Sequence, residues 1–368
     1  MKVCHFTSGH NSLDGRIFHK QCKSLAEAGY EVYLVAQDGM DLDRDGVHVR
    51  SVRMNSANRF YRMLKTAKDV YKKALEIDAD IYHFHDPELI PYGKRLKRLG
   101  KKVIFDSHED NPANISEKHW IPKPFRKLVA YWYEIYERKS ISSFDALIAV
   151  TPHVVDRLRK CNKNTFMVTN YPIVNPEDEV RPFNVDGPFC YVGRISDEGL
   201  QKNFIKALGM VEGARYLLAG PCSPKYLSEL EKIQGWEKVD FVGEVAFSDS
   251  RDIFSRSLAG VQLMDYIANC GYKIGTLGNT KLFGYLEAGL PVICTDYELW
   301  KEIVDVHDCG ICINPHDITA LADAIRFFAT HPLEAKRMGE NGRRAILEKY
   351  NWKMQEKVLL ECYSSIHA

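Results

Sequence analysis

The sequence predicts an α/β protein of two domains, each a doubly wound parallel sheet with helices on both faces. Short runs rich in β-branched and aromatic residues alternate with helical patterns along the chain, which is the order of βαβ units. The runs are almost continuously apolar, which is typical of strands buried on both faces of a parallel sheet. A chain of 368 residues is long enough for two such cores. We therefore expect two Rossmann-like domains that face a central cleft.

Predicted strands occur in both halves of the chain. In the first half they lie at 3–7, 31–36, 47–52, 81–85, 102–108, 146–151 and 165–170. In the second half they lie at 189–193, 215–220, 239–243, 259–264, 291–296 and 310–313.

A Pro- and Asp-rich segment after Asn170 has weak periodicity and is the best candidate for a linker. The predicted domains are residues 1–170 and 175–350. The last residues, about 352–368, predict a terminal helix that could pack on either domain.

The two halves of the chain differ in charge. Residues 1–170 hold 29 Lys and Arg against 21 Asp and Glu, a net charge of +8. The remaining residues hold 21 against 28, a net charge of −7. The two domains are therefore expected to have different partners. Nucleic acid is not among them, because the basic residues form no recognisable nucleic-acid-reading motif.

The sequence also bears on location. Its N-terminus does not resemble a secretory signal peptide, and no run of about 18 apolar residues predicts a membrane span. Ten cysteines are scattered along the chain. The one C-x-x-C pair, Cys309 and Cys312, is typical of a strand with both thiols in the core. We expect a reducing compartment, the cytoplasm.

Two basic amphipathic segments lie in the first half. Over 59–75, apolar residues fall on one helical face and Lys and Arg on the opposite face. Over 118–139, aromatic residues such as Trp120 and Trp132 are mixed with Lys and Arg. Two interpretations stay open: solvated helices over a core, or helices that dock on anionic lipid headgroups at the inner face of a membrane.

Polar residues follow the predicted strands of the first half, at the edge where doubly wound sheets bind ligands. The first strand leads into a polar loop with Gly15 and Arg16 ahead of a helix, which offers backbone N–H groups to an anion. The loop is not a G-x-G-x-x-G, so dinucleotide binding is disfavoured.

The fourth and fifth strands end in two polar clusters that suit acid–base chemistry or hydroxyl recognition. The clusters contain His85, Asp86 and Glu88, and His108, Glu109 and Asp110. Neither has the helical H-E-x-x-H spacing, so no metal site is predicted.

In the second half, Gly193 and Arg194 leave a predicted strand, and Lys202 lies eight residues after Arg194. A strand-end Arg near a helix start suits a diphosphate, which a guanidinium can bind bidentately.

A second candidate anion site opens a later helix. Asn279 and Thr280 predict its N-cap, and Lys281 lies in its first turn. Lysine is unfavourable there in a lone helix, because the N-terminal end already carries a positive partial charge. An anionic ligand would remove this conflict.

The chain resembles the retaining family 4 (group 1) glycosyltransferases of GT-B fold, and in particular a bacterial subgroup of cell-surface polysaccharide enzymes. The matching segments run nearly end to end. They are D-G-R-I-F (14–18), L-A-E-A-G-Y-E-V (25–32), H-D-P-E-L-I-P (85–91), D-S-H-E-D (106–110), N-Y-P (170–172), Y-V-G-R-I-S (191–196), L-L-A-G (217–220), T-K-L-F-G-Y-L-E-A-G-L-P-V-I (280–293) and W-K-E-I-V (300–304).

The resemblance implies a nucleotide-sugar donor held mainly by the second domain. It also implies a glycan or lipid-linked acceptor held by the first domain, where the two strand-end clusters lie. The terminal helix would cross back to the first domain. Transfer would proceed with retention, without a metal ion or other cofactor.

The resemblance also assigns roles to residues. Arg194 would contact the diphosphate with help from Lys202, and the backbone of Thr280, Lys281 and Leu282 would cradle it. His108 would face the donor sugar and help to position it. Glu302 would lie near the sugar or the nucleotide.

Three positions depart from the family pattern. Members usually carry two glutamates eight positions apart, and here Thr276 and Gly284 stand in those places. The second glutamate normally holds the ribose hydroxyls, and Glu287, one helical turn later, could partly replace it. Glu198 stands where a basic residue is usual, although Lys202 could reach back.

These departures keep open a catalytically degenerate homologue that acts as a binding partner or scaffold. Two further functions are disfavoured on other grounds. Some nucleotide-sugar epimerases share this architecture, but the acceptor-side motifs here match transferases. A metal-dependent transferase would use a D-x-D motif, and Asp78-Ala79-Asp80 fits that string but precedes a strand instead of following one.

Overall fold

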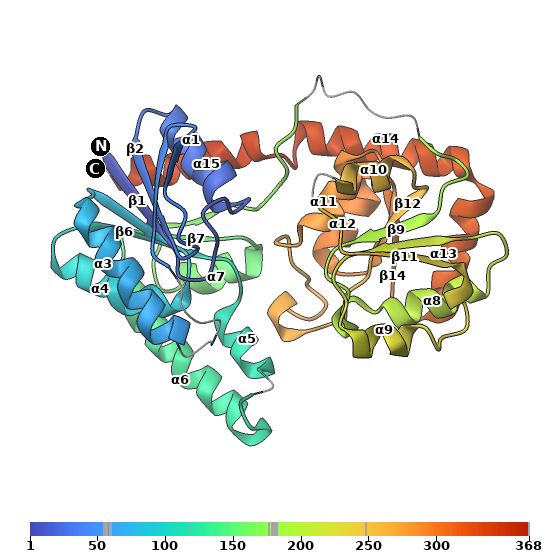
Figure 1. Cartoon of the computed structure of the whole chain (residues 1–368), viewed down its shortest axis with the longest axis horizontal. Coiled ribbons are helices and arrows are strands. Elements are labelled where there is room, and N and C mark those ends of the chain that lie inside the picture. The colour runs from blue at the N-terminus through green and yellow to red at the C-terminus, as the bar shows by residue number, and fades with distance from the viewer. Residues whose placement is uncertain are drawn as a thin grey trace. The chain divides into compact units, whose positions relative to one another are not determined.

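The computed structural model describes residues 1–53, 58, 61–118, 120–175, 177, 183–246 and 249–366. The chain divides into two compact units (Figure 1). Unit 1 is Met1–Asn170 together with Trp352–Ala368, and unit 2 is Tyr171–Asn351. Each unit has one largely parallel sheet covered by helices, so the predicted fold class of two Rossmann-like domains is confirmed.

The sheet of unit 1 has the strand order β3-β4-β2-β1-β5-β6-β7-β8. Its strands are β1 (Lys2–Phe6), β2 (Glu31–Ala36), β3 (Leu42–Arg44), β4 (Val47–Ser51), β5 (Ile81–Phe84), β6 (Lys102–Ser107), β7 (Ala146–Ala149) and β8 (Thr165–Met167). Neighbouring strands pair in parallel, except β3 with β4. All the carboxyl ends of the parallel strands therefore meet at one edge, where the polar clusters lie.

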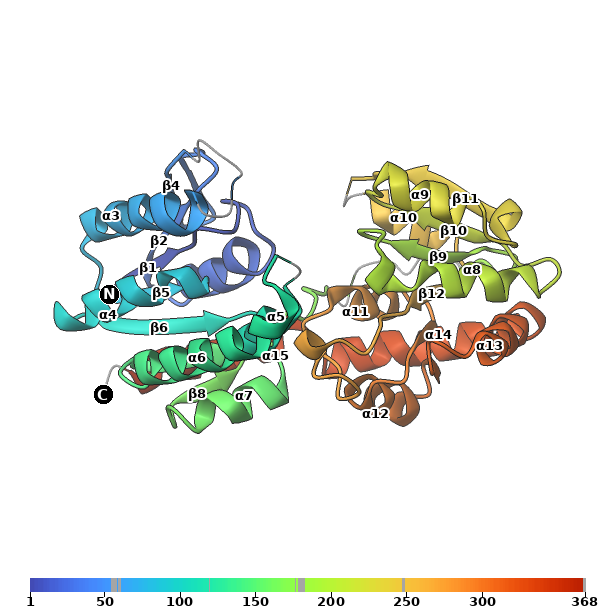
Figure 2. The ribbon, with the colours of Figure 1, turned by 90° about the horizontal axis from the view of Figure 1, so that it is seen from below.

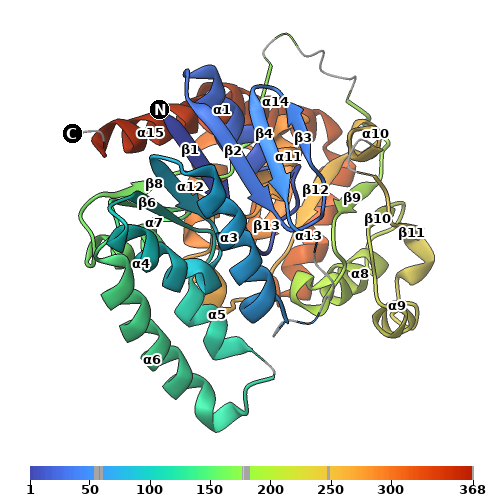
Figure 3. The same cartoon turned by 60° about the vertical axis from the view of Figure 1, so that its left-hand side comes forward.

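The helices of unit 1 cover both faces of its sheet. They are η1 (Ile17–Cys22), α1 (Lys23–Glu27), η2 (Arg62–Thr66), α3 (Ala67–Ile77), η3 (Pro87–Leu89), α4 (Ile90–Arg98), α5 (Asn111–Glu117), α6 (Lys123–Ile141), α7 (Pro152–Arg159) and α15 (Trp352–Ser365). The terminal helix α15 packs against η1 and β8, and α5 lies beside α6 (Figure 3).

Alternate residues of the unit 1 strands enter two separate cores. Val3 and Ile81 share one core with η1, α1 and α15, whereas Cys4 and Tyr82 share the other with α3, α4 and α7. Successive side chains of a strand point to opposite faces. His5 and His83 are therefore on the face that α15 covers.

The sheet of unit 2 is parallel throughout, with the order β11-β10-β9-β12-β13-β14. Its strands are β9 (Phe189–Val192), β10 (Tyr216–Ala219), β11 (Val239–Gly243), β12 (Ala259–Gln262), β13 (Val292–Thr295) and β14 (Gly310–Ile313). Figure 2 shows the helices packed around this sheet. They are η4 (Asp197–Gly199), α8 (Gln201–Gly209), α9 (Pro224–Leu230), η5 (Trp236–Lys238), α10 (Ser250–Ser255), η7 (Ala268–Cys270), α11 (Thr280–Glu287), α12 (Glu298–His307), α13 (Ile318–Thr330) and α14 (Pro332–Glu348).

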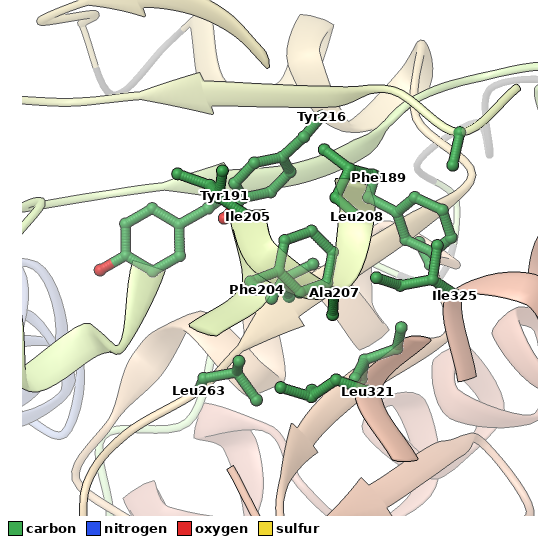
Figure 4. Close-up of a cluster of buried hydrophobic side chains, with 14 of the residues drawn as sticks. Phe189, Tyr191, Phe204, Ile205, Ala207, Leu208, Tyr216, Leu263, Leu321 and Ile325 are labelled. Atoms are coloured by element: carbon green, nitrogen blue, oxygen red, sulfur yellow. The ribbon is translucent and has the colours of Figure 1, made fainter. Parts of the chain in front are cut away.

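One core of unit 2 lies between its sheet and helices α8 and α13 (Figure 4). Phe204 and Leu208 of α8 are four residues apart, so they share a helical face, and both are fully buried against Phe189 and Tyr216. Burying a side chain of this size contributes about 1.5–3 kcal/mol. The opposite face of the sheet packs on α11 and α12.

Strand β3 was not predicted from the sequence, because its only apolar residue is the half-buried Leu42 and both Asp43 and Arg44 are exposed. A tight turn places it against β4: Asp45 and Gly46 have φ values of 53° and 75°. An Asp-Gly pair with both φ angles positive is a favoured two-residue hairpin turn. The Asp-Gly dipeptide was therefore the signal that could have revealed this hairpin.

The C-x-x-C segment lies in the predicted core position. Cys309 is fully buried just before β14, and Cys312 is half-buried within it. The Cys312 sulfur lies 3.5 Å from that of Cys294 on β13, and all ten cysteines are free. The segment therefore forms a strand as predicted, but only the Cys309 thiol, just outside the strand, is fully buried.

The two amphipathic segments differ in burial. In the first, Ala67, Val70 and Ala74 are buried, as expected of a helix over a core. The predictions for Arg59 and Phe60 lie outside the described residues. The second segment forms α6, which exposes most of its apolar side chains. Of the helices in the described part of the chain, none is long and apolar enough to cross a membrane.

Much of the predicted linker, residues 176 and 178–182, also lies outside the described residues, as do positions 367–368 of the predicted terminal helix.

Candidate functional site

Four histidines from neighbouring strands gather near the carboxyl edge of the unit 1 sheet. His5 and His83 are paired in the β1–β5 register, and their rings lie 4.3 Å apart. His85 follows β5 and is almost completely buried, whereas His108 follows β6 and remains partly exposed. Only His85 and His108 were predicted. A histidine at matching positions of two buried strands was the signal for the other two.

Hydrogen bonds connect these rings to the terminal helix. Tyr363 of α15 places its hydroxyl 2.9 Å from His83 Nδ1 and 3.0 Å from His5 Nε2. The other nitrogen of His5, Nδ1, lies 3.0 Å from His85 Nε2. His85 Nδ1 in turn lies 3.2 Å from His108 Nε2. A continuous buried chain thus joins the last helix to the residue expected to face the donor sugar.

Asp106, on β6, is the charged centre of this cluster. Arg16 forms a bidentate ion pair with its carboxylate, from Nε at 3.1 Å and Nη2 at 2.9 Å, and Gln21 Nε2 donates at 2.7 Å. Burial by itself would raise the pKa of Asp106, but Arg16 and His108 hold that pKa well below its usual range. The carboxylate is therefore ionised and acts as an acceptor only.

The position of Arg16 corrects its predicted role. Its backbone N–H, which was expected to face an anion, donates to Asp14 Oδ1 at 2.8 Å. Its side chain is about 5% exposed and paired with Asp106, so neither group is presented to an external anion. The sequence could not show this, because the partner lies 90 residues away on β6. Gly15, beside it, is exposed and a side chain there would meet no atom within 4 Å.

Asp86 and Glu88 hold the loop that follows β1. Asp86 Oδ2 accepts hydrogen bonds from Thr7 Oγ1 at 2.7 Å and from the Ser8 backbone N–H at 2.7 Å. Glu88 pairs with Arg62 Nε at 2.9 Å and accepts from Ser8 Oγ at 3.1 Å. Both carboxylates therefore shape the loop beside the histidines.

The second predicted acidic pair lies around the start of α5. Asp110 caps this helix by accepting from the Ala113 N–H at 3.4 Å, and it pairs with Arg157 at 3.5 Å. Glu109 accepts from the side chain of Asn114. The structure thus gives these two residues local structural contacts.

His10 and Asp14 form a further pair that the sequence analysis missed. His10 Nδ1 lies 3.0 Å from Asp14 Oδ2, and its ring lies 5.0 Å from that of His108. Burial lowers the pKa of His10, but Asp14 and Asp86 outweigh this effect and raise it. A histidine in the loop after β1, four residues before an aspartate, was the available signal.

One set of atoms in the cluster has the spacing of a metal site. His85 Nδ1, His108 Nε2 and Asp106 Oδ2 lie 3.2–3.5 Å from one another. Three ligands of a tetrahedral zinc ion with bonds of about 2.0–2.1 Å would have similar spacing. Against a cation, Arg16 and Gln21 already donate to this carboxylate oxygen.

Unit 2 builds its candidate site at the start of α11. The Asn279 side chain accepts from the Lys281 N–H at 3.1 Å and caps the helix, as predicted. The Lys281 side chain lies over the Tyr191 ring, with Nζ 5.6 Å from the ring centre. Burial lowers its pKa. Within the described residues, no carboxylate lies within ion-pair distance of this amine.

Gly193 makes room for Lys281, and Gly220 makes room for Gly193. A Cβ atom at Gly193 would lie 2.1 Å from Lys281 Cε, and one at Gly220 would lie 1.9 Å from the Gly193 carbonyl oxygen. Their φ angles of 147° and 136° also favour glycine. The end of β10 thus approaches the end of β9, and the end of β9 approaches Lys281 of α11, without intervening side chains.

The other predicted cations of unit 2 differ in their contacts. Arg194 is exposed, and its backbone carbonyl accepts from the Tyr191 hydroxyl at 2.8 Å. Lys202 pairs with Glu229 at 2.7 Å and with Asp197 at 3.3 Å. A ligand would therefore have to displace these carboxylates to use Lys202.

The remaining predicted donor residues lie along α11 and α12. Thr280 and Leu282 flank Lys281 in the first turn of α11. Glu287 ends that helix, about 10 Å further along at 1.5 Å per residue, and pairs with Arg251 at 3.6 Å. Glu302 is exposed on α12. The structure thus separates Glu287 from the start of the helix.

Gly284 lies one turn after the start of α11. A Cβ atom there would meet no atom within 4 Å, so the helix has open space where the family pattern has a glutamate.

A polar cluster after β12, β13 and β14 was not predicted. His316 Nε2 lies 2.8 Å from Asp265 Oδ1, the Tyr297 hydroxyl donates to the Asp265 carbonyl at 2.5 Å, and Tyr266 donates to Asp296. Each residue follows a parallel strand. The strand-end rule that found His85 would also have found Asp265 and Asp296.

A cavity of about 500 Å³ lies elsewhere in unit 2, lined by Ser257, Gly289, Lys336 and Arg343, among others. Ser257 precedes β12 and Gly289 follows the end of α11. The cavity is therefore at the amino edge of the sheet, away from the residues described above.

Two protein-family models match the chain. Residues 15–177 match Glycosyltransferase Family 4, and residues 179–345 match Glycosyl transferases group 1. Between them they leave only the two ends of the chain and one residue unmatched. A search of curated protein sequences returned no significant match.

Solved structures share the fold over the whole chain. Sucrose-phosphate synthase from Thermosynechococcus elongatus has a TM-score of 0.76 at 16% identity, covering 100% of this chain and 99% of its own. Anabaena Alr3699/HepE in complex with UDP and glucose has a TM-score of 0.71 at 13% identity, covering 99% and 100%. WaaG, a glycosyltransferase involved in lipopolysaccharide biosynthesis, has a TM-score of 0.68 at 15% identity, covering 97% and 98%.

The buried histidines predict a loss of stability in mild acid. Burial lowers the pKa of His85 to about 3 and holds the pKa values of His5 and His83 well below 6.5. Below pH 6.5 these groups bind protons in the unfolded chain but not in the folded one, so stability falls as pH falls. Between pH 7.5 and 5.5 the free energy of unfolding of unit 1 should drop by up to about 4 kcal/mol from these three groups.

Urea denaturation at both pH values measures this drop. In His83→Gln the drop should be about one third smaller, whereas replacing the exposed His331 by Gln should leave it unchanged. Equal stability of the native chain at the two pH values would contradict the burial of the three rings.

Proposed function

The chain belongs to the group 1 glycosyltransferases, and we propose that it transfers a sugar from a nucleotide-diphosphate sugar to a glycan or lipid-linked acceptor, with retention and without a metal ion. The observation that carries this proposal is the start of α11, where the partly buried, desolvated amine of Lys281 has no acidic partner among the described residues. We place the enzyme in the cytoplasm, in the synthesis of a surface polysaccharide.

The charge at this site favours an anionic ligand. Lys281 adds a positive charge to the positive end of the α11 dipole. Desolvation disfavours the charged amine, which is why its pKa is lowered. A diphosphate would neutralise the amine and accept from the backbone N–H groups of the first turn. In the transfer step the same contacts would stabilise the charge that develops on the departing nucleotide.

The related structures support a nucleotide ligand of this kind. Alr3699/HepE was solved with UDP and with UDP-glucose, and TarM with UDP. Arg194, exposed at the end of β9, is free to add a bidentate contact to a diphosphate. We assign the acceptor to unit 1. His108 is the residue that we expect to contact the donor sugar, and His85 lies behind it.

A second candidate function rests on Gly284. Open space at this position leaves the site without a carboxylate for ribose hydroxyls, and Glu287 is paired with Arg251 at the far end of the helix. A homologue with this gap could bind a partner or a glycan without transferring sugar. Binding of a nucleotide would favour the transferase function, and absence of binding would favour the function as a binding partner or scaffold.

We expect one nucleoside diphosphate to stabilise the chain without added metal. Thermal unfolding with UDP, GDP, ADP, dTDP and the monophosphate CMP, and with their sugars, should show a selective shift for one of the diphosphates. Ligand at about 100 times its Kd adds about 2.7 kcal/mol, a rise of roughly 5–10 °C for a domain of this size.

Lys281→Ala should weaken that binding by roughly 10–100-fold, the loss expected of one charge-assisted contact of about 1.5–3 kcal/mol. Lys206→Ala removes an exposed charge from α8 and should leave the affinity unchanged. No shift with any nucleotide, from folded protein, would favour the scaffold function.

A second prediction concerns the open space at Gly284. Gly284→Glu should be accommodated and should tighten binding of the selected nucleotide by about tenfold or more, because the new carboxylate can accept from ribose hydroxyls. Gly284→Ala is the control: it removes the same helix-interior glycine, worth about 1 kcal/mol of stability, but adds no carboxylate. Equal affinities of the two variants in calorimetric titrations would contradict a ribose contact at this position.

Membrane contact is proposed for the α6 patch, defined as the exposed apolar side chains Phe125, Leu128, Val129, Tyr131 and Trp132. Apolar side chains so densely exposed on one helix are uncommon on a free surface. Exposed basic residues of the same helix, such as Lys123 and Lys127, would attract anionic headgroups. A lipid-linked acceptor would be found at such a surface.

We expect the chain to float with vesicles that contain anionic lipid, and less so in high salt. Leu128→Ser with Trp132→Ser should lower the bound fraction severalfold. The pair Val306→Ser and Leu333→Ser, at two exposed apolar positions of unit 2, should have no effect. Absence of salt-sensitive flotation would contradict membrane docking by α6.

A further inference from the structure

We propose that Tyr363 on the terminal helix is a positioning residue, which fixes the ring nitrogen of His108 that carries the proton. The inference rests on the proposed function in one respect, namely that His108 contacts the substrate sugar. Its basis is the buried chain His83–Tyr363–His5–His85–His108, in which every link is 2.9–3.2 Å long.

Each link of this chain needs one hydrogen. A neutral histidine has one donor nitrogen and one acceptor nitrogen, and burial keeps His5, His83 and His85 neutral by lowering the pKa of each. The chain therefore has only two consistent arrangements. The hydrogens point either from His83 toward His108 or in the opposite direction.

The His83 end favours the first arrangement. His83 Nε2 is buried and has no hydrogen-bond partner in the described part of the molecule. If the hydrogens pointed toward His83, its Nε2 would carry a buried N–H without an acceptor, which would lower the free energy of unfolding. In the opposite arrangement His83 Nδ1 donates to the Tyr363 oxygen, and Nε2 is left as an unprotonated nitrogen.

The Asp106 end does not distinguish the two arrangements. Asp106 Oδ2 lies 3.5 Å from His85 Nδ1 and 3.4 Å from His108 Nε2, so in either arrangement one N–H and one bare nitrogen face the carboxylate. The His83 end therefore sets the direction: Tyr363 donates to His5 Nε2, His5 Nδ1 to His85 Nε2, and His85 Nδ1 to His108 Nε2.

This assignment has two consequences at His108. Its Nε2 accepts a hydrogen bond and is unprotonated, so neutral His108 carries its proton on Nδ1. His108 therefore offers the substrate an N–H donor, suited to an oxygen of a sugar and not to abstraction of a proton. The assignment also places a proton on His85 Nδ1, which excludes that nitrogen as a metal ligand in this state.

The Tyr363 hydroxyl fixes the direction in which the hydrogen bonds run from His83 to His108. It is the only link of the chain that is not a histidine, and it joins His83 to His5 through one oxygen that accepts and donates. Without it, His5 can carry its proton on either nitrogen. The hydrogens from His5 to His108 are then free to reverse.

The tautomer of His108 can be measured directly. Long-range proton–nitrogen NMR correlations of the full chain with ¹⁵N-labelled histidine distinguish protonated from bare ring nitrogens, and His108→Gln identifies the His108 signals by their loss. We expect Nδ1 protonated and Nε2 bare. Tyr363→Phe should convert this single tautomer to a mixture with a protonated Nε2.

The matched control is Trp352→Phe, which deletes another buried hydrogen bond of α15, from Trp352 Nε1 to Ser24 Oγ at 2.9 Å. It should leave the His108 tautomer unchanged. A proton on His108 Nε2 in the native chain or an unchanged tautomer in Tyr363→Phe would each overturn the proposal. The measurement needs no sugar nucleotide, so failure of nucleotide binding would be a separate result.

Discussion

The buried ion pair between Arg16 and Asp106 is the interaction on which the unit 1 site depends. It joins the first helix after β1 to the end of β6. Gln21, His85 and His108 are arranged around the same carboxylate. An isolated charge at this depth would be strongly destabilising, and breaking such a pair typically costs about 3–5 kcal/mol. Loss of either partner would therefore also disturb the histidines that contact this carboxylate.

The two units differ in whether the charges at their candidate sites are paired. In unit 1 the buried guanidinium and carboxylate neutralise one another, and the acidic side chains Asp86 and Asp110 are engaged by backbone N–H groups and Arg157. In unit 2 the partly buried amine of Lys281 lies over the Tyr191 ring, with no carboxylate at ion-pair distance in the part of the chain that the structure describes. A satisfied network is suited to holding side chains rigid, whereas an uncompensated cation is suited to receiving an anion.

The terminal helix α15 connects the end of the polypeptide to the histidines of strands β1 and β5. Tyr363 reaches His5 and His83 from a distance of about 280 or more positions in sequence. Leu359 and Cys362 of the same helix are buried in the core that η1 and α1 share. Packing of α15 and ordering of the histidines are therefore parts of one event, because the hydroxyl can meet both rings only when the helix is seated.

Much of this protein was determined by local sequence. Runs such as 215–220 and 291–296 are apolar enough to predict buried strands, and Asn279 predicts the start of α11, because hydrophobic periodicity and capping depend on neighbours in the chain. The strand-end rule likewise found His85, Asp86 and His108. It also singled out Lys281 as a charge in conflict with its own helix.

What the sequence could not decide was which side chains meet across the sheet. Arg16 was predicted to bind an external anion, but Asp106 takes its guanidinium from 90 residues away. His5 and His83 were counted only as strand residues, and Tyr363 only as part of a terminal helix. Their contacts depend on strand register and on the face that α15 covers. Only the tertiary structure decides these, because pairing across a parallel sheet is set by the packing of the whole unit and not by any one segment.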